Sequence, residues 1–123
     1  MDPSPDLRRL RELQRTLALD LPELVDRLVG DTAAAVLGIK AAIAEGDLEG
    51  VARAAHAARN DALMLGAPPL LAALERLEQA ARSGQADVAS TAFEQLEAIW
   101  PPTRQALERA ARRDARPPQG HPR

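Results

Sequence analysis

The sequence predicts an all-α protein, built as an antiparallel up-down four-helix bundle with an additional N-terminal helix and a kinked C-terminal helix. Three observations support this fold class. The apolar residues, 46% of the 123-residue chain, are mostly Ala and Leu, with one Phe, one Trp and no Tyr, and Ala and Leu favour helices over strands. They recur every three to four residues in five segments. The turns between these segments are short, which places consecutive helices antiparallel.

The first helix is expected over residues 6–19, where leucines recur at helical spacing. The second helix is expected to run from Asp20 to Gly46. Asp20 is a favourable N-cap residue, Pro22 fits the first helical turn, and Glu23 stands three residues after the cap. Together these three residues predict a well-defined helix start.

The third helix is expected between the cap residue Asp47 and Gly66, which fits a C-terminal position that needs positive φ. Pro68 and Pro69 are expected to open the fourth helix, and the pair 83–84 (Ser-Gly) closes it. The apolar face of the third helix consists of Leu48, Val51, Ala55, Ala58, Ala62 and Leu65.

The last helix is expected to begin at residues 85–87 and to run to Trp100. Pro101 and Pro102 follow directly. Because proline removes a backbone donor and clashes with the preceding turn, the helix must break or kink there. Residues 103–113 can resume as a helix.

Composition at the two ends differs from that of the middle. Residues 1–5 and 114–123 are rich in proline, so we expect a disordered start and a disordered tail or linker. The helical bundle is expected over residues 6–113.

Charge and composition also exclude several functions. The formal net charge is −2, which gives no general reason to bind nucleic acid or an anionic membrane. The absence of cysteine excludes disulfides, thiolate catalysis and Cys-ligated zinc. The chain has no long apolar run and its N-terminus lacks the pattern of a signal peptide, so a cytoplasmic protein is expected.

Candidates for reactive groups are few. The chain has two histidines: His121 lies in the proline-rich tail, whereas His56 lies in the middle of the third helix. No serine has the context of a catalytic triad, and no glycine-rich phosphate loop is present. The acidic residues are spread along polar faces, so no metal site is expected.

His56 is expected at the surface, because its direction on the helix lies roughly 120° from the centre of the apolar face. Residues one or two turns away share this part of the surface. The expected neighbours of His56 are Ala52, Arg53, Arg59, Asn60 and Leu63.

An exposed imidazole nitrogen is a nucleophile, and a phosphorylated imidazole is a good phosphoryl donor. Arg53 and Arg59 would offset the charge of a phosphoryl group. The small Ala52 would leave room for a partner, and Leu63 would meet an apolar patch on it. The alternative is an ordinary surface histidine on a solvated helix face.

Residues 55–67 resemble the signature of the histidine-containing phosphotransfer (HPt) family, approximately A-H-x-L-K-G-x-[AS]-x-x-[LI]-G-[AL]. The histidine, the basic residue three positions later and the Leu-Gly-Ala ending match in register, and the resemblance extends over residues 21–99. It implies that His56 is a phosphoacceptor, that Arg59 steadies the phosphoryl group or the partner contact, and that Gly66 is the helix stop.

The resemblance also implies the partner, which is the receiver domain of a response regulator or hybrid histidine kinase. Such a receiver supplies the Mg²⁺ and the acidic pocket, so we expect no cofactor on this chain. We expect a monomer that carries a phosphoryl group and has no catalysis of its own.

Two residues depart from the family pattern. Asn60 stands where the family usually has Gly, so its amide either donates a hydrogen bond to the phosphoryl group or obstructs docking. Ala58 stands where Leu is common, which thins the core. The alternative functions are an HPt-like module that binds a receiver or kinase without being phosphorylated, and a dimerisation or scaffolding bundle that uses Leu63 and Met64.

Overall fold

A computed structural model of the chain describes residues 5–17 and 20–115, and these described residues form five helices and no strand. The all-α fold class is therefore confirmed. The helices are α1 (Arg8–Leu17), α2 (Leu21–Ala44), α3 (Leu48–Met64), α4 (Pro68–Arg82) and α5 (Ala86–Ala115). None of the helices within the described ranges is both long enough and apolar enough to cross a membrane.

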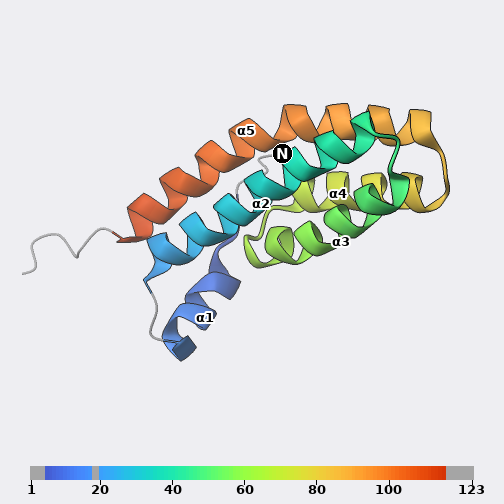
Figure 1. The fold of residues 1–123 in the computed structure, drawn as a ribbon. Helices are drawn as coiled ribbons and strands as arrows, with labels where there is room; N and C mark the ends of the chain where they lie inside the picture. The colour runs from blue at the N-terminus through green and yellow to red at the C-terminus, as the bar shows by residue number, and fades with distance from the viewer. Residues whose placement is uncertain (1–4, 18–19, 116–123) are drawn as a thin grey trace, which may run out of the picture.

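Helices α2 to α5 form the bundle. Each packs against the next along the chain, and α5 closes the ring by packing against α2 (Figure 1). Helices α3 and α4 are shorter than α2 and α5, which therefore extend past them at one end of the bundle. The additional helix α1 contacts α2 at this end.

The helix starts follow the predicted caps. The side chain of Asp20 accepts a hydrogen bond from the backbone N–H of Glu23 at 3.4 Å, and Asp47 accepts one from Gly50 at 2.9 Å. These bonds satisfy N–H groups that have no partner within the helix.

Gly66 ends α3 with a φ of 61°, as predicted, and has a second role that the sequence analysis did not find. Its carbonyl oxygen accepts a hydrogen bond from the backbone N–H of Asp6 at 2.7 Å. A Cβ atom on Gly66 would run into the carbonyl oxygen of Asp6. The glycine thus lets the N-terminal segment cross the turn between α3 and α4, and Leu7 and Leu10 follow it into the core.

Helix α5 continues through Pro101 and Pro102, so the break that was one of the two expected outcomes is not found. Both prolines are exposed, as are residues 97 and 98, whose carbonyls lose their helical partners. Because these residues are exposed, their carbonyls are accessible to water, while the buried Trp100 and Leu107 hold both halves of the helix to the bundle. The ribbon of α5 bends partway along its length (Figure 1), in agreement with the expected kink.

The two ends of the chain are described only in part. Helix α5 reaches Ala115, two residues past the predicted end at 113. Residues 1–4, 18–19 and 116–123, including His121, lie outside the described residues. The disordered start and tail therefore stay predictions.

Candidate functional site

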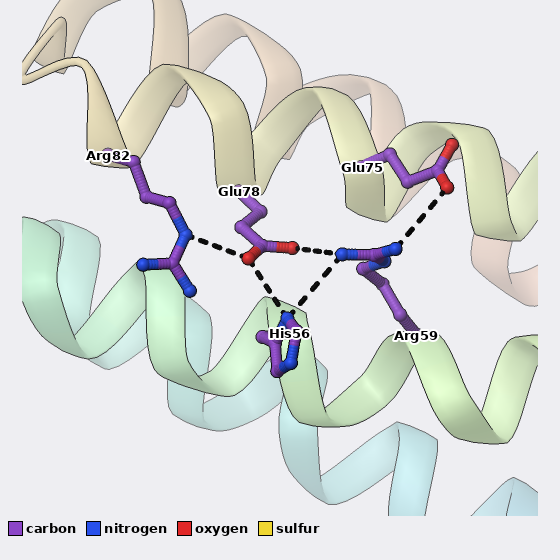
Figure 2. A network of polar contacts seen from close by, with 5 residues as sticks. All are labelled: His56, Arg59, Glu75, Glu78 and Arg82. Carbon is purple, nitrogen blue, oxygen red and sulfur yellow. Dashed lines mark hydrogen bonds and ion pairs between the residues drawn. The ribbon is translucent and has the colours of Figure 1, made fainter.

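His56 lies at the middle of α3, and its side chain is 58% exposed. Its sequence neighbour Ala55 and the next residue of the apolar face, Ala58, are buried in the core. The backbone of α3 is therefore held firmly at this point, while the imidazole ring projects from it. The ring leans toward α4 (Figure 2).

The central group of the site is Glu78 of α4, whose side chain is only 9% exposed. Its carboxylate accepts three hydrogen bonds (Figure 2). His56 Nδ1 lies 3.0 Å from Oε2, Arg82 Nε lies 2.8 Å from the same oxygen, and Arg59 Nη1 lies 2.8 Å from Oε1. A carboxylate this deep in a protein must be paired with donors, because its charge has lost most of its water.

Two opposing effects set the pKa of Glu78. Burial disfavours the charged form and raises the pKa, but the hydrogen bonds from Arg59, Arg82 and His56 together outweigh burial, so the pKa is lowered from its ordinary value of 4.5. Glu78 is therefore a carboxylate at neutral pH. This fixed negative charge sits directly against Nδ1 of the imidazole.

Arg59 connects the site to a second carboxylate. Its Nη2 lies 3.7 Å from Glu75, and its Nη1 lies 3.4 Å from His56 Nδ1. Arg59 is half-buried, whereas Arg82 is exposed for most of its length. Arg59 is therefore held between two carboxylates beside the imidazole, and Arg82 reaches the site from the other side of the ring (Figure 2).

The remaining predicted neighbours surround His56 on α3. Arg53 and Asn60 are exposed, and Arg53 pairs with Glu49 at 3.9 Å. Leu63 is 41% exposed, which leaves a large apolar side chain at the surface as expected.

Ala52 is only 5% exposed, so it is not the surface residue that helical periodicity predicts, and its role of leaving room for a partner stays a prediction. The reason is that α3 packs against both α2 and α4, so its buried sector is wider than its apolar stripe. Ala52 lies at the floor of a depression between α3 and α4, and Arg53 and Arg82 border this depression.

Glu78, Arg82 and Glu75, all on α4, were not among the residues predicted from the sequence. A signal for Glu78 was present. At about 100° per residue it falls on the same face as Leu74 and Leu77, and both are fully buried. A charged residue in the apolar stripe of a helix is a candidate for a buried functional group.

The fold and the site define a helical bundle that presents one exposed histidine against a buried carboxylate. Comparison with family models agrees with this class. The Hpt domain model matches residues 23–110, and the chain belongs to the Hpt domain family. Proteins of this family are phosphotransfer carriers of two-component signalling rather than classical enzymes.

A solved structure gives the same result. The chain is similar to histidine-containing phosphotransfer protein B (HptB) from Pseudomonas aeruginosa PAO1, with a TM-score of 0.81 and 27% sequence identity over 92% of this chain and 98% of that one. A sequence search of curated proteins gave no match.

Proposed function

We propose that His56 is the phosphoacceptor of a phosphorelay, and that it takes a phosphoryl group from the aspartate of one receiver domain and gives it to another. The observation that carries this proposal is the orientation of the ring. Nδ1 is engaged by Glu78 at 3.0 Å, while the other ring nitrogen, Nε2, faces away from Glu78 on a side chain that is 58% exposed (Figure 2).

The exchange needs only one nucleophilic atom from this chain. The lone pair of Nε2 attacks phosphorus, the new N–P bond forms, and the P–O bond to the receiver aspartate breaks, so that the aspartate leaves as a carboxylate. The reverse reaction passes the phosphoryl group to the next receiver. The Mg²⁺ ion and the acidic pocket belong to the receiver, and no residue of this chain has to hold a cofactor.

The surroundings of His56 suit a partner that approaches from outside. Arg53 and Arg59 place positive charge beside the site, which favours a dianionic phosphoryl group. Leu63 offers an exposed apolar contact one to two turns further along α3. We propose that a single copy of the chain is the functional unit.

The test is a transfer assay with a panel of phosphorylated receiver domains. Label that is acid-labile and base-stable should appear on the wild type and should be lost in His56→Gln, while Arg76→Ala, a change on an exposed arginine of α4, keeps it. Label that persists in His56→Gln would place the phosphoacceptor elsewhere and would refute the proposal.

A second function is favoured by one observation. Asn60 is exposed one turn from His56, where a receiver that docks over the histidine would meet its side chain. In this alternative, the protein binds a receiver or kinase without being phosphorylated. Measurable binding to a receiver with no label on His56 would support it, and a gain of transfer in Asn60→Gly would show that crowding by the side chain is the cause.

A further inference from the structure

A groove separate from the histidine site runs along the second half of α5. Its volume is about 570 Å³, a size in the range of known ligand sites. Three segments form its walls: residues 98–113 of α5, the start of α4, and Pro5, which precedes α1. None of the residues around His56 takes part, and α5 lies across the bundle from α3 (Figure 1). A molecule in this groove would therefore leave His56 accessible.

Most of the side chains that line the groove have no rotamers to lose. Alanine and proline give up almost no side-chain entropy when another molecule covers them. Six lining residues are of these two types: Pro5, Pro69, Ala98, Pro102, Ala106 and Ala110. Ile99 adds a larger apolar side chain that is half-buried. The groove is thus a preformed apolar surface, and binding to such a surface carries a small ordering cost.

Pro102 leaves a hydrogen-bond acceptor in the groove. Because proline has no N–H, the carbonyl oxygen of Ala98, four residues earlier, lacks its helical partner. Both residues line the groove, so an N–H group of a bound molecule can donate to this carbonyl. The backbone N–H groups inside a helix are already used, whereas those of an extended segment are free to donate. The carbonyl therefore favours an extended chain over a helix as the occupant.

The C-terminal end of the groove is positively charged. Arg109 and Arg113 line it and are exposed, and their spacing of four residues places them on one face of α5. Neither arginine has an ion pair with a residue that the structure describes, and the lining of the groove within the described ranges includes no carboxylate. Like charges at this spacing repel each other, and a carboxylate between them would relieve the repulsion.

The helix dipole does not account for this pair of arginines. Cations are favourable in the last turn of a helix, and Arg112 and Arg113 belong to that turn of α5. Arg109 lies one turn earlier, where the effect of the dipole has largely faded. Arg112 is exposed but does not line the groove, so it provides a matched control for the two arginines that do.

We propose that the groove binds an extended segment of a protein partner that combines apolar residues with Asp or Glu. The apolar side chains cover Ile99 and the alanines, a backbone N–H donates to the carbonyl of Ala98, and the carboxylates pair with the two arginines. From residue 98 to residue 113 the helix rises about 22 Å, which roughly seven extended residues span. A partner held here stays bound while His56 remains open to a receiver.

The test begins with a display library of random twelve-residue peptides selected on the full chain. We expect the selected peptides to combine apolar residues with at least two acidic ones. The strongest binder is synthesised, and fluorescence anisotropy measures its dissociation constant. A selection that yields no binding peptide, or only peptides without acidic residues, would overturn the proposal.

Charge reversal on α5 tests the site. Arg109→Glu and Arg113→Glu should each weaken binding roughly tenfold or more, because each replaces an attraction by a repulsion. Arg112→Glu makes the same charge change outside the groove and should weaken binding less than about threefold, since salt screens more distant charges. Circular dichroism confirms that the variants are folded. Equal weakening by all three variants would mean that only the general charge of this end matters, and would overturn the proposal.

An NMR titration locates the bound peptide. Backbone amide signals of residues 98–113 should shift as the peptide is added, and those around His56 should not. The largest shifts around His56 would place the peptide at the histidine site and would contradict the inference. None of these measurements involves a phosphoryl group, so their outcome is independent of the function proposed above.

Two other occupants of the groove have outcomes of their own. A dimer of the wild type in sedimentation equilibrium that becomes a monomer in Arg109→Glu would assign the groove to a second copy of the chain. A variant without residues 1–4 that binds the peptide at least tenfold more tightly than the wild type would assign it to the start of the chain itself. Either result would overturn the proposal of a partner segment.

Discussion

Replacement of Gly66 by alanine should destabilise the protein more than the same change at Gly46. Both glycines have positive φ, 61° and 72°, and alanine in this conformation costs roughly 1–2 kcal/mol. Only at Gly66 does the new Cβ meet another segment, because the carbonyl oxygen of Asp6 occupies its place, whereas nothing lies within 4 Å at Gly46. Relief of that clash must break the hydrogen bond from Asp6 to Gly66, which contributes about 1 kcal/mol.

The N-terminal segment would then move away from the bundle and loosen the contacts of Leu7 and Leu10, which are buried. Partial loss of this apolar burial adds about 1 kcal/mol. We therefore expect a total loss of about 3–4 kcal/mol for Gly66→Ala against about 1–2 kcal/mol for Gly46→Ala.

Urea denaturation followed by far-UV circular dichroism measures both losses by linear extrapolation. Because Gly46→Ala carries the backbone cost alone, the difference between the two variants isolates the contact with the N-terminal segment. Equal losses would refute the reasoning, since they would mean that residue 6 does not lie against the turn between α3 and α4.

Three further predictions concern the surface and the charges. Leu63→Ala should weaken binding to a cognate receiver, measured by titration calorimetry, roughly fivefold to thirtyfold, with little change in stability. Val88→Ala, which shortens an exposed apolar side chain on α5, is the control, and equal weakening by both variants would argue against a specific contact. The pKa of Glu78 is lowered from 4.5, so the contribution of this residue to stability is present above about pH 4.5 and is lost as the pH falls through the lower pKa of the folded state. In that pH range the urea midpoint of the wild type should fall more steeply than that of Glu78→Gln, and the same pH dependence in both proteins would contradict the ion pairs. The hydrogen bonds from Arg8 lower the pKa of Asp6 from 3.8 to about 2, so Arg8→Ala should return its NMR titration toward 3.8, and an unchanged titration would show that Arg8 is not the cause.

Most helix boundaries could be predicted from the sequence, because the signals that set them lie close together in the chain and agree with the tertiary structure. The caps at Asp20 and Asp47 and the positive φ at Gly46 and Gly66 depend on residues close in sequence. Helical periodicity placed His56 outside the core for the same reason. These features require no knowledge of which helices become neighbours.

The errors and omissions arise where distant segments meet. Ala52 is buried in the core that α3 forms with α2 and α4, and the contact of Gly66 with Asp6 joins residues sixty positions apart. Helix α5 is continuous because Pro101 and Pro102 lie on its exposed face. The carbonyls that lose their helical hydrogen bonds there are accessible to water.

The site itself was half predictable. His56 and Arg59 belong to one helix, so their proximity follows from a spacing of three residues. Glu78 and Arg82 come to the site from α4, and their role depends on how α3 packs against that helix. A carboxylate within an apolar stripe was the one clue in the sequence, and it identified neither the partner of the carboxylate nor the nitrogen it contacts.

The most direct test of the central claim is a chase experiment on the phosphorylated protein. The wild type is labelled from a phosphorylated receiver, purified, and mixed with an unphosphorylated receiver and Mg²⁺. We expect label to leave His56 and to appear on the receiver aspartate, and His56→Gln never to acquire label that it could pass on. Label that stays on the protein in the presence of every receiver, or that passes equally well through His56→Gln, would contradict the claim that His56 is a phosphoryl carrier.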